Sequence, residues 1–310
     1  MKYIIGVDGG GTKTEVVVCN LHGHIVAREI GGSSNPNDIG NDAMLKTVGC
    51  LIEKALPNDC DCADIGLGIS GIFTAGSEEF LEKGLKKRFS FLDKVRAYSD
   101  RDSALNCAYN GDGCVVIIGT GSVGAVRKDG KVKDIGGGGY LIDDALSGFD
   151  LGREALNAVL CANDGIGEKT VITDLFNELT GENIRKHLKI VYQKGKAYVA
   201  SFAPLVFTSL EKNDKVSKEI MKKCVSGFIR LLLAVYNAWG KEKCEITLFG
   251  GLSGRIDVIK EYMCDEVKEK IIFKTPEHPI IYGLIKEFIS DKTEADKNFT
   301  RDYEYLTKSE

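Results

Sequence analysis

The stretch Gly6-Val7-Asp8-Gly9-Gly10-Gly11-Thr12-Lys13-Thr14 decides the fold. A short apolar strand, Tyr3–Val7, ends at Asp8, and the three glycines turn the chain into a valine-rich second strand, Thr14–Asn20. A third strand, His24–Ile30, follows, and this close spacing predicts an antiparallel meander. Glycines in a turn between strands allow close backbone approach to a ligand, and bare backbone amides can bind an anion.

The same order of elements recurs further along the chain. Cys114–Ile118 is an apolar strand, Gly119-Thr120-Gly121-Ser122 is its turn, and the strands Val123–Arg127 and Lys131–Ile135 complete a second meander that stops at Gly136–Gly139. One such turn is readily explained as a hairpin turn, but two matching turns favour a shared role in anion binding. Two copies of a meander followed by helices predict a duplicated α/β fold with a cleft between its halves.

Further elements follow each meander. Helical periodicity predicts helices at Asn41–Leu56, Glu78–Arg88, Ser103–Tyr109, Gly148–Asn163, Thr170–Thr180, Lys196–Trp239 and Pro279–Ile289. Short apolar runs predict strands at Ile65–Ser70, Val95–Ser99, Glu245–Phe249 and Ile271–Phe273. The tail after Ser290 is polar, and we expect it to be frayed.

Composition excludes several classes of protein. The 310 residues, 43% of them hydrophobic, are enough for two domains. The balance of 41 Lys and Arg against 45 Asp and Glu argues against an electrostatic nucleic-acid binder. We expect no signal peptide, because Asp8 comes before an apolar region could form, and no apolar run approaches the ~20 residues of a membrane helix. The ten cysteines lie singly apart from Cys60 and Cys62, so we expect reduced thiols in a cytoplasm, with a metal or redox role for that pair left open.

The first glycine turn offers several groups to a phosphate. Gly9, Gly10 and Gly11 expose backbone amides, Thr12 and Thr14 offer hydroxyls, and Lys13 offers a positive charge. Asp8, at the end of a strand, can orient a magnesium ion through water molecules.

The second glycine turn matches a dinucleotide-binding pattern only in part. Gly119-Thr120-Gly121-Ser122-Val123-Gly124 reads G-x-G-x-x-G, but a strand and a hairpin follow where that fold needs a helix. We therefore interpret it as a second phosphate loop. Gly250-Gly251, after another strand, could contact the base or ribose of a nucleotide.

Polar residues at other strand ends are candidates for chemistry. In Ser99-Asp100-Arg101-Asp102, one carboxylate could act as a general base and the other as a helix cap, or both could be caps. Asn35 and Asn37 lie in a polar loop that could bind hydroxyls or simply form a turn. Asp143-Asp144 follows the four-glycine run as a further acidic pair.

Together these motifs resemble the BadF/BadG/BcrA/BcrD ATPase family, and within it the N-acetylglucosamine kinase branch of the superfamily of sugar kinases, actin and heat-shock chaperones. The resemblance extends from Lys2 to Ile289 and rests on the segments already quoted, together with Gly31–Asn37, Gly136–Ser147 and Leu248–Gly251. It implies two ribonuclease-H-like, actin-like ATPase domains that close on ATP and a sugar. We expect these domains at residues 1–112 and 113–310, with a last helix at 279–289 that can pack back on the first.

The resemblance also implies roles for individual residues. Asp100 matches the catalytic base, and Gly250 and Gly251 fall in the adenosine motif. The positions at which family members touch the amino sugar correspond here to Asn35, Ser122, Gly138, Gly139 and Asp144. The family usually has Gly-Asp-Glu-Gly-Ser-Gly after the glycine run, where this chain has Asp143-Asp144-Ala145-Leu146-Ser147-Gly148. This departure predicts an altered sugar pocket.

The sequence and the resemblance together predict an ATP-dependent kinase. It would transfer the γ-phosphate to the 6-hydroxyl of N-acetylglucosamine, glucosamine or N-acetylmuramic acid, with Mg²⁺ held through Asp8 and water. Asp100 would accept the hydroxyl proton. The alternative is an ATP-hydrolysing switch or activator with no sugar substrate. A homodimer is left open as its assembly.

Overall fold

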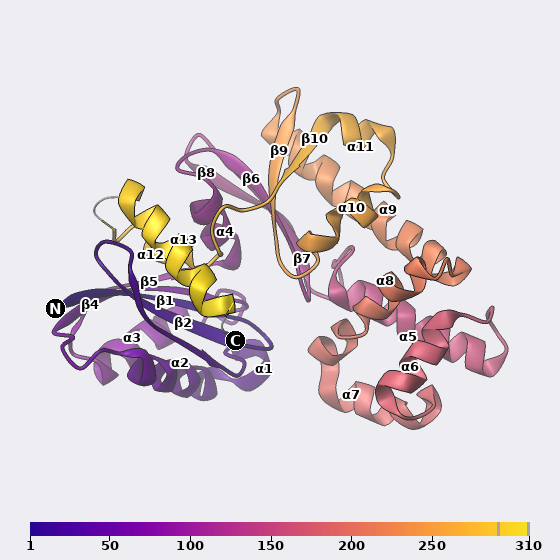
Figure 1. Ribbon diagram of the computed structural model, residues 1–310, viewed down its shortest axis with the longest axis horizontal. Coiled ribbons are helices and arrows are strands. Elements are labelled where there is room, and N and C mark those ends of the chain that lie inside the picture. The colour runs from indigo at the N-terminus through magenta and orange to yellow at the C-terminus, as the bar shows by residue number, and fades with distance from the viewer. Residues whose placement is uncertain (290–291, 309–310) are drawn as a thin grey trace. The chain divides into compact units, whose positions relative to one another are not determined.

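The computed structural model describes residues 1–289 and 292–308 (Figure 1). The chain forms two compact units, one made of Met1–Asn110 with Pro276–Glu310 and the other of Gly111–Thr275. These contact-defined units differ from the expected division, which assigned residues 113–310 to one domain. The chain passes into the second unit after Asn110 and returns to the first at Pro276, so the first unit is built from both ends of the sequence.

Each unit contains one five-stranded mixed sheet. The order in the first unit is β3-β2-β1-β4-β5, with β1 antiparallel to β2, β2 antiparallel to β3, and β1, β4 and β5 parallel. Its strands are β1 (Lys2–Gly9), β2 (Thr14–Asn20), β3 (Ile25–Gly31), β4 (Cys62–Ile69) and β5 (Leu92–Tyr98). The carboxyl ends of the three parallel strands therefore meet at one edge of the sheet, which is where α/β folds bind ligands.

The second sheet repeats this topology in the order β10-β9-β6-β7-β8. Its strands are β6 (Gly113–Ile118), β7 (Ser122–Lys128), β8 (Lys131–Gly136), β9 (Cys244–Phe249) and β10 (Ile271–Lys274). Strands β6, β7 and β8 form the antiparallel meander, and β9 and β10 extend the sheet in parallel with β6. The predicted duplication of the α/β fold is thus confirmed.

Helices cover both faces of the first sheet (Figure 1). The helices of this unit are α1 (Pro36–Ile39), α2 (Asn41–Ala55), α3 (Glu78–Arg88), α4 (Asp100–Ala108), α12 (Tyr282–Ile285) and α13 (Lys292–Lys308). Residues of β1 alternate between the two faces, so Ile5 and Val7 lie in the core under α2 and α3. Gly6 lies on the other face, where a Cβ would be 2.8 Å from Ile285 of α12.

The second unit carries a larger helical layer on its sheet. Its helices are α5 (Gly148–Asp164), α6 (Val171–Thr180), α7 (Ile184–Ala200), α8 (Ala203–Glu211), α9 (Lys215–Trp239), α10 (Ile256–Lys260) and α11 (Asp265–Lys270), with a 3₁₀ turn at Ser253–Arg255. One continuous apolar core joins β6 and β9 to α5, α6, α8 and α9. The predicted single stretch Lys196–Trp239 is instead the end of α7 followed by α8 and α9. A left-handed Asn213 and the cap at Asp214 separate α8 from α9.

The polar tail is a helix rather than a frayed end, which corrects our expectation. α13 buries Ala295 and Phe299 completely, and their spacing of four residues places them on one helix face. Gly23, in the turn between β2 and β3, makes room for this contact, since a Cβ there would lie 2.6 Å from the Ala295 carbonyl oxygen. These two apolar residues bury one face of α13, and Ala295 packs against the turn at Gly23.

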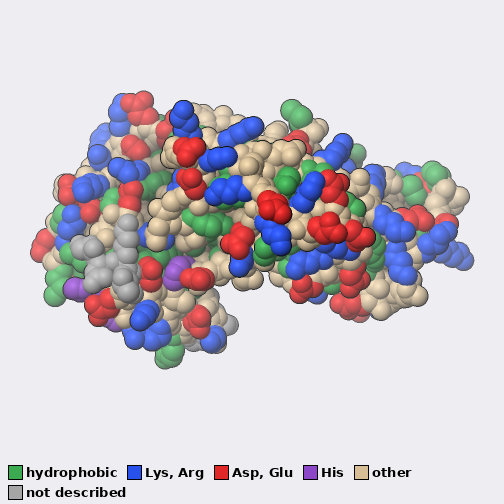
Figure 2. Space-filling view, turned by 90° about the horizontal axis from the view of Figure 1, so that it is seen from above, with side chains coloured by type: hydrophobic (Ala, Val, Ile, Leu, Met, Phe, Trp, Pro, Cys, Tyr) green, Lys and Arg blue, Asp and Glu red, His purple; other side chains and the backbone are tan. Residues whose placement is uncertain are grey.

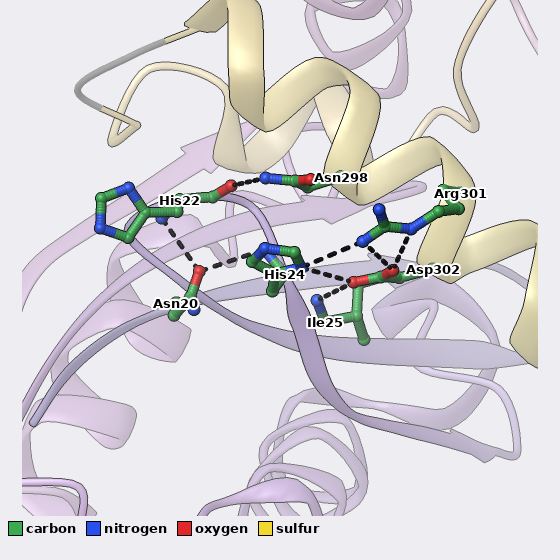
Figure 3. Close-up of polar contacts among 7 residues, drawn as sticks. All are labelled: Asn20, His22, His24, Ile25, Asn298, Arg301 and Asp302. Atoms are coloured by element: carbon green, nitrogen blue, oxygen red, sulfur yellow. Dashed lines mark hydrogen bonds and ion pairs between the residues drawn. The ribbon is translucent and has the colours of Figure 1, made fainter.

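Polar contacts fix the position of α13 on that hairpin (Figure 3). The Asn298 amide donates to the His22 carbonyl over 3.0 Å. The Asp302 carboxylate lies 3.1 Å from Nδ1 of His24 and accepts from the backbone amide of Ile25 over 3.3 Å. Side chains of α13 therefore satisfy polar groups of the hairpin that the sheet leaves unpaired.

The predicted helix at Pro279–Ile289 is shorter than expected. Only Tyr282–Ile285 is α-helical, and tight turns lead into it and out of it.

On the face shown in Figure 2, acidic and basic side chains are interspersed rather than gathered by sign. Within residues 1–289 and 292–308, no helix has both the length and the apolar character required to cross a membrane.

Candidate active site

The first glycine turn is held in place by its own backbone and by two neighbouring loops. The Gly10 amide donates to the Lys13 carbonyl over 2.8 Å and closes the turn. The Ser34 amide donates to the Gly10 carbonyl over 3.1 Å, and the Ser70 amide donates to the Gly9 carbonyl over 2.8 Å. A Cβ on Gly9 would collide with the Ser34 hydroxyl. Packing against Ser34 therefore favours glycine at position 9, independently of any need for a ligand to approach the backbone.

The predicted phosphate-binding residues divide into an exposed set and a buried one. Gly11, Thr12 and Lys13 are exposed at the tip of the turn. Thr14 is fully buried, and its hydroxyl donates to the Gly32 carbonyl over 2.7 Å. The side chain of Thr14 thus ties two loops together, while the tip remains accessible to a ligand.

Asp8 is a carboxylate in an unfavourable place for a negative charge. Burial raises the pKa of Asp8 to about 7, and the negative charges of Glu15 and Asp100 add to this effect, while Lys13 opposes it. Asp8 lies directly opposite Glu15 in the β1–β2 pair, so the two side chains share one face of the sheet. The site therefore concentrates negative charge that a bound cation would relieve.

Glu15 is the partner in this pair whose charge is compensated. Its carboxylate accepts from Nε of Arg28 over 2.6 Å and from the Tyr303 hydroxyl over 2.9 Å. The Arg28 guanidinium also lies over the Tyr303 ring, 5.5 Å from its centroid. Glu15 is therefore part of a closed structural cluster, and Asp8 is the carboxylate of this pair that is left without such partners. A second carboxylate, that of Asp38, also lies beside the turn, since a Cβ on Gly11 would be 3.1 Å from its Oδ2.

These residues fit a magnesium ion held through water. No group of three or more His, Cys, Asp or Glu side chains in the described part of the chain could ligate a metal directly. Mg²⁺ usually keeps several waters and binds through one or two carboxylates plus substrate phosphates. Asp8, with its raised pKa and the exposed turn beside it, matches that mode of binding.

Asp100 is the first residue of α4, at the same edge of the sheet as Asp8. Gly68 of β4 pairs with both Asp8 and Tyr98, so the ends of β1 and β5 lie on either side of one strand. The Asp100 carboxylate is 39% exposed, contacts the Arg101 guanidinium at 3.6 Å and accepts from the Arg101 amide.

Asp102 has a different role from Asp100. The Ser99 hydroxyl caps α4 by accepting from the Asp102 amide, and it donates to the Asp102 carboxylate over 2.7 Å. The Asp102 carboxylate thus holds the capping hydroxyl of Ser99 in place. The helix cap itself is Ser99, and of the two carboxylates it is Asp102 that contacts the cap.

Asn35 and Asn37 lie beside the first glycine turn. Asn35 caps α1 by accepting from the Asn37 amide over 3.0 Å, and the Asn37 side chain donates to the Gly71 carbonyl over 3.2 Å. Gly71 has a φ of 83°, and a Cβ there would be 2.5 Å from both asparagine side chains. The first unit thus brings Asn35, Asn37, Asp8 and Asp100 to one edge of its sheet.

The second glycine turn is as tightly held as the first. The Gly119 amide donates to the Gly121 carbonyl over 2.9 Å, and the first amides of α5 donate to the carbonyls of Gly119 and Thr120. Gly250, with a φ of 92°, packs against the backbone before the turn, since a Cβ there would be 2.5 Å from the Ile118 carbonyl oxygen. Added Cβ atoms at Gly119 and Gly251 would meet open space.

Asp144 packs against this second turn. Its Oδ1 accepts from the Ser122 amide over 2.5 Å, and its Oδ2 is buried with no hydrogen-bond partner in the described structure. Burial raises the pKa of Asp144, and the positive charge of Lys196 opposes that shift most, its Nζ lying 3.7 Å from Oδ2. The second unit therefore brings Ser122, Asp144 and the glycines around Gly119 and Gly250 together.

The loop between the four-glycine run and α5 is held by contacts within the loop and with α5. Gly139 bridges to Asp143, and Gly138 lies against the Asp143 side chain. Leu146 stands where the resembled family has glycine, and it adopts a left-handed φ of 54°. Its side chain is fully buried and its amide donates to Asp150 over 3.1 Å, so packing supports a conformation that favours glycine.

Ser34, which packs against Gly9, belongs to the polar loop that the sequence singled out. Lys196, which contacts Asp144, was not predicted as a site residue. For Lys196 the sequence did hold a signal, because Gly195 interrupts a helical pattern directly before it.

The raised pKa of Asp8 predicts how stability depends on pH. Between the unfolded pKa near 4 and the folded pKa of about 7, the folded protein binds the extra proton, so wild-type stability falls as pH rises. Asp8→Asn removes this penalty. Its gain in free energy of unfolding is expected to be on the order of 1–4 kcal/mol at pH 8 and to shrink toward pH 4.

Urea unfolding of both proteins at several pH values checks this expectation, with the exposed Asp42→Asn in the same unit as the control. A gain for Asp8→Asn that is the same at pH 5 and pH 8 would contradict a buried, titrating Asp8.

Three comparisons with curated relatives give a consistent result. The chain is 28% identical over 292 residues to the N-acetylmuramic acid/N-acetylglucosamine kinase of Clostridium acetobutylicum, covering 91% of this chain and 94% of that protein. It is 25% identical to a glucosamine kinase of Vibrio cholerae, and the match covers 92% of this chain and 95% of that protein. It is 26% identical to the N-acetyl-D-glucosamine kinase of Dictyostelium discoideum, and the match covers 86% of this chain and 91% of that protein.

Solved structures share the fold. A proposed N-acetylglucosamine kinase from Chromobacterium violaceum matches with a TM-score of 0.75 and 23% identity, over 92% of this chain and 98% of that one. A second, from Porphyromonas gingivalis, matches with a TM-score of 0.74 and 18% identity, over 92% and 97%. The model of the BadF/BadG/BcrA/BcrD ATPase family matches residues 5–285, and the chain, with a glycine turn on each of two sheets of the same topology, belongs to that family.

Proposed function

We propose that the protein transfers the γ-phosphate of ATP to the 6-hydroxyl of an amino sugar. The observation that supports this most is the position of Asp100 beside Asp8 and a rigid glycine turn, at the carboxyl ends of parallel strands. The curated relatives act on N-acetylglucosamine, N-acetylmuramic acid or glucosamine, and this agreement on amino sugars supports the substrate class.

Each glycine turn would offer backbone groups to the phosphates of ATP. The amides around Gly9–Thr12 and Gly119–Ser122 would donate to phosphate oxygens and stabilise charge on the transferring group. Gly250 and Gly251 would lie against the adenosine. The turns are pinned by hydrogen bonds before ligand arrives, so little reorganisation is needed on binding.

Asp8 would hold Mg²⁺ through water molecules. When bound, Mg²⁺ neutralises charge on the phosphates. What the chain itself supplies is a half-buried carboxylate next to an exposed turn, with Glu15 already neutralised by Arg28. Of the Asp8–Glu15 pair, Asp8 thus presents the uncompensated charge.

Asp100 would act as the general base. As the sugar oxygen bonds to the γ-phosphorus, its proton passes to the Asp100 carboxylate and the bond to the bridging oxygen breaks, which releases ADP. The partial exposure of Asp100 makes its carboxylate reachable by a substrate hydroxyl.

The sugar would be bound by the remaining polar groups near the two turns. These are Asn35, Asn37, Ser122, Gly138, Gly139 and Asp144. Asp144 accepts one amide through Oδ1, so Oδ2 is the atom that would accept a sugar hydroxyl. Ala145 replaces the family's usual glutamate, which removes a polar contact and favours an amino-sugar preference different from that of a typical N-acetylglucosamine kinase.

A panel of sugars tests the proposed function. ADP release is measured with N-acetylglucosamine, glucosamine, N-acetylmuramic acid and 6-deoxy-N-acetylglucosamine. We expect strong stimulation by at least one amino sugar and none by the 6-deoxy analogue, which lacks the accepting hydroxyl. Slow ADP release that no sugar changes would instead indicate an ATP-hydrolysing switch.

Asp100→Asn is expected to reduce sugar phosphorylation by about 10²–10⁴-fold while ATP binding is preserved. The matched control is Asp102→Asn, two residues away in the same helix turn, which alters the cap of α4 but no group proposed to touch substrate. Steady-state kinetics and ATP titration calorimetry of both variants provide the measurement. Equal turnover by the two variants would make Asp100 a second cap.

Gly119→Ala is expected to weaken ATP binding without loss of stability. An added Cβ meets open space in the free protein, so the fold tolerates it, but it would obstruct approach of a phosphate to the turn. Gly111→Ala, equally open and two residues before β6, is the control. Calorimetry should show weaker ATP binding for Gly119→Ala alone; unchanged affinity would return this turn to a purely structural role.

A further inference from the structure

Lys196 is a charged residue of the second unit to which neither the family pattern nor the proposed reaction gives a role. Its Nζ lies 3.7 Å from Oδ2 of Asp144 and 5.5 Å from the centroid of the Tyr140 ring. A Cβ on Gly121 would be 3.2 Å from the same Nζ. The ammonium group is therefore placed between the buried carboxylate and the second glycine turn.

The backbone before Lys196 is unusual. α7 is broken at Gly195, whose φ of 67° and ψ of −152° belong to a region that essentially only glycine adopts. An added Cβ at Gly195 would meet open space, so no packing contact demands glycine there. The break redirects the last turn of α7, and Lys196 is the first residue after it.

The Asp144 side chain is only 6% exposed, and its Oδ2 has no hydrogen-bond partner in the described structure. A buried carboxylate without compensation becomes protonated and then no longer accepts hydrogen bonds through both oxygens. Lys196 supplies the compensating charge without occupying Oδ2 by a hydrogen bond, because 3.7 Å is too long for one.

We propose that Lys196, directed by the break at Gly195, is a positioning residue that keeps the Asp144 carboxylate charged and in place for a sugar hydroxyl. This inference rests on the proposed function of Asp144 in sugar binding. The flexible lysine stem allows the ammonium group to shift as a hydroxyl approaches while the charge stays near.

The groups that act on Asp144 divide into those that favour its charged form and those that oppose it. Lys196 of α7, the Ser122 amide of β7 and the Ser147 hydroxyl before α5 favour the charged form, whereas burial and the negative charge of Asp150 in α5 oppose it. Lys196 is the one full positive charge among them, so its removal should raise the pKa of Asp144 further.

The kinetic test uses Lys196→Met, Lys196→Arg and Asp144→Asn, singly and combined. Lys196→Met is expected to raise the KM for the sugar by about 10- to 100-fold, with little effect on ATP, and to shift the acidic limb of the kcat/KM profile to higher pH. Lys196→Arg should restore most of the affinity, because it keeps the charge. In the Asp144→Asn background, Lys196→Met should cost nothing more.

The break is tested separately by Gly195→Ala, which adds strain but no clash. It should raise the sugar KM in the same direction as Lys196→Met. Gly181→Ala is the matched control, since Gly181 also has a positive φ of 72° and open space around its Cβ position but ends α6. A KM increase in both glycine variants would indicate a general loss of stability and would overturn the role of the break.

A measurement without sugar keeps this inference separate from the proposed function. In Lys196→Met, stability should fall as pH rises from about 5 to 8, because an acid with a raised folded pKa is penalised once ionised. Adding Asp144→Asn should restore that loss at pH 8.

Urea unfolding of the single and double variants provides this second readout. Failure of Asp144→Asn to restore stability, or additive kinetic losses in the double variant, would overturn the inference. A wild-type protein that phosphorylates no sugar, combined with the expected unfolding result, would reject only the proposed function.

Discussion

Close approach of one backbone to another at glycine is the constraint on which both units depend. In the first unit, α12 lies so near the sheet that a Cβ on Gly66 would overlap the Leu284 carbonyl. In the second, a Cβ on Gly152 of α5 would overlap the Val199 carbonyl of α7. These contacts bring helix backbones to positions that no larger residue allows, and the polar groups at the strand ends are placed by them.

The two units treat buried carboxylates in contrasting ways. Glu15 receives a guanidinium and a phenol, and its charge is fully compensated. Asp144 receives one amide and a more distant ammonium group. Asp8 has only the exposed Lys13 to oppose two negative neighbours. The negative charge of Glu15, a structural residue, is thus better compensated than the charges of Asp144 and Asp8 near the glycine turns. A ligand's charge or hydroxyl groups could complete the compensation at those two residues.

Much of the fold was accessible from the sequence, because local patterns encode it. The alternation of strand, glycine turn and strand occurs twice, and each copy formed the predicted meander. Asp8, Asp100 and Asp144 stood out as acids beside strand ends or glycine runs. The docking of α13 was not accessible, since Ala295 and Phe299 are few among charged residues and become a buried face only against Gly23. Lys196 was missed for a similar reason, because its partner lies about fifty residues away in sequence and the link depends on the backbone at Gly195.

The return of the chain to its first unit has a consequence for synthesis on the ribosome. The sheet of β1 to β5 leaves the ribosome first, but the α12 and α13 segments that cover one of its faces leave last. Until then, the face lined by Gly6, Gly66 and Gly68 lacks its partner. Residues 111–275 form a continuous segment and can complete their own core earlier. The half that is synthesised first is therefore the half that can finish folding last.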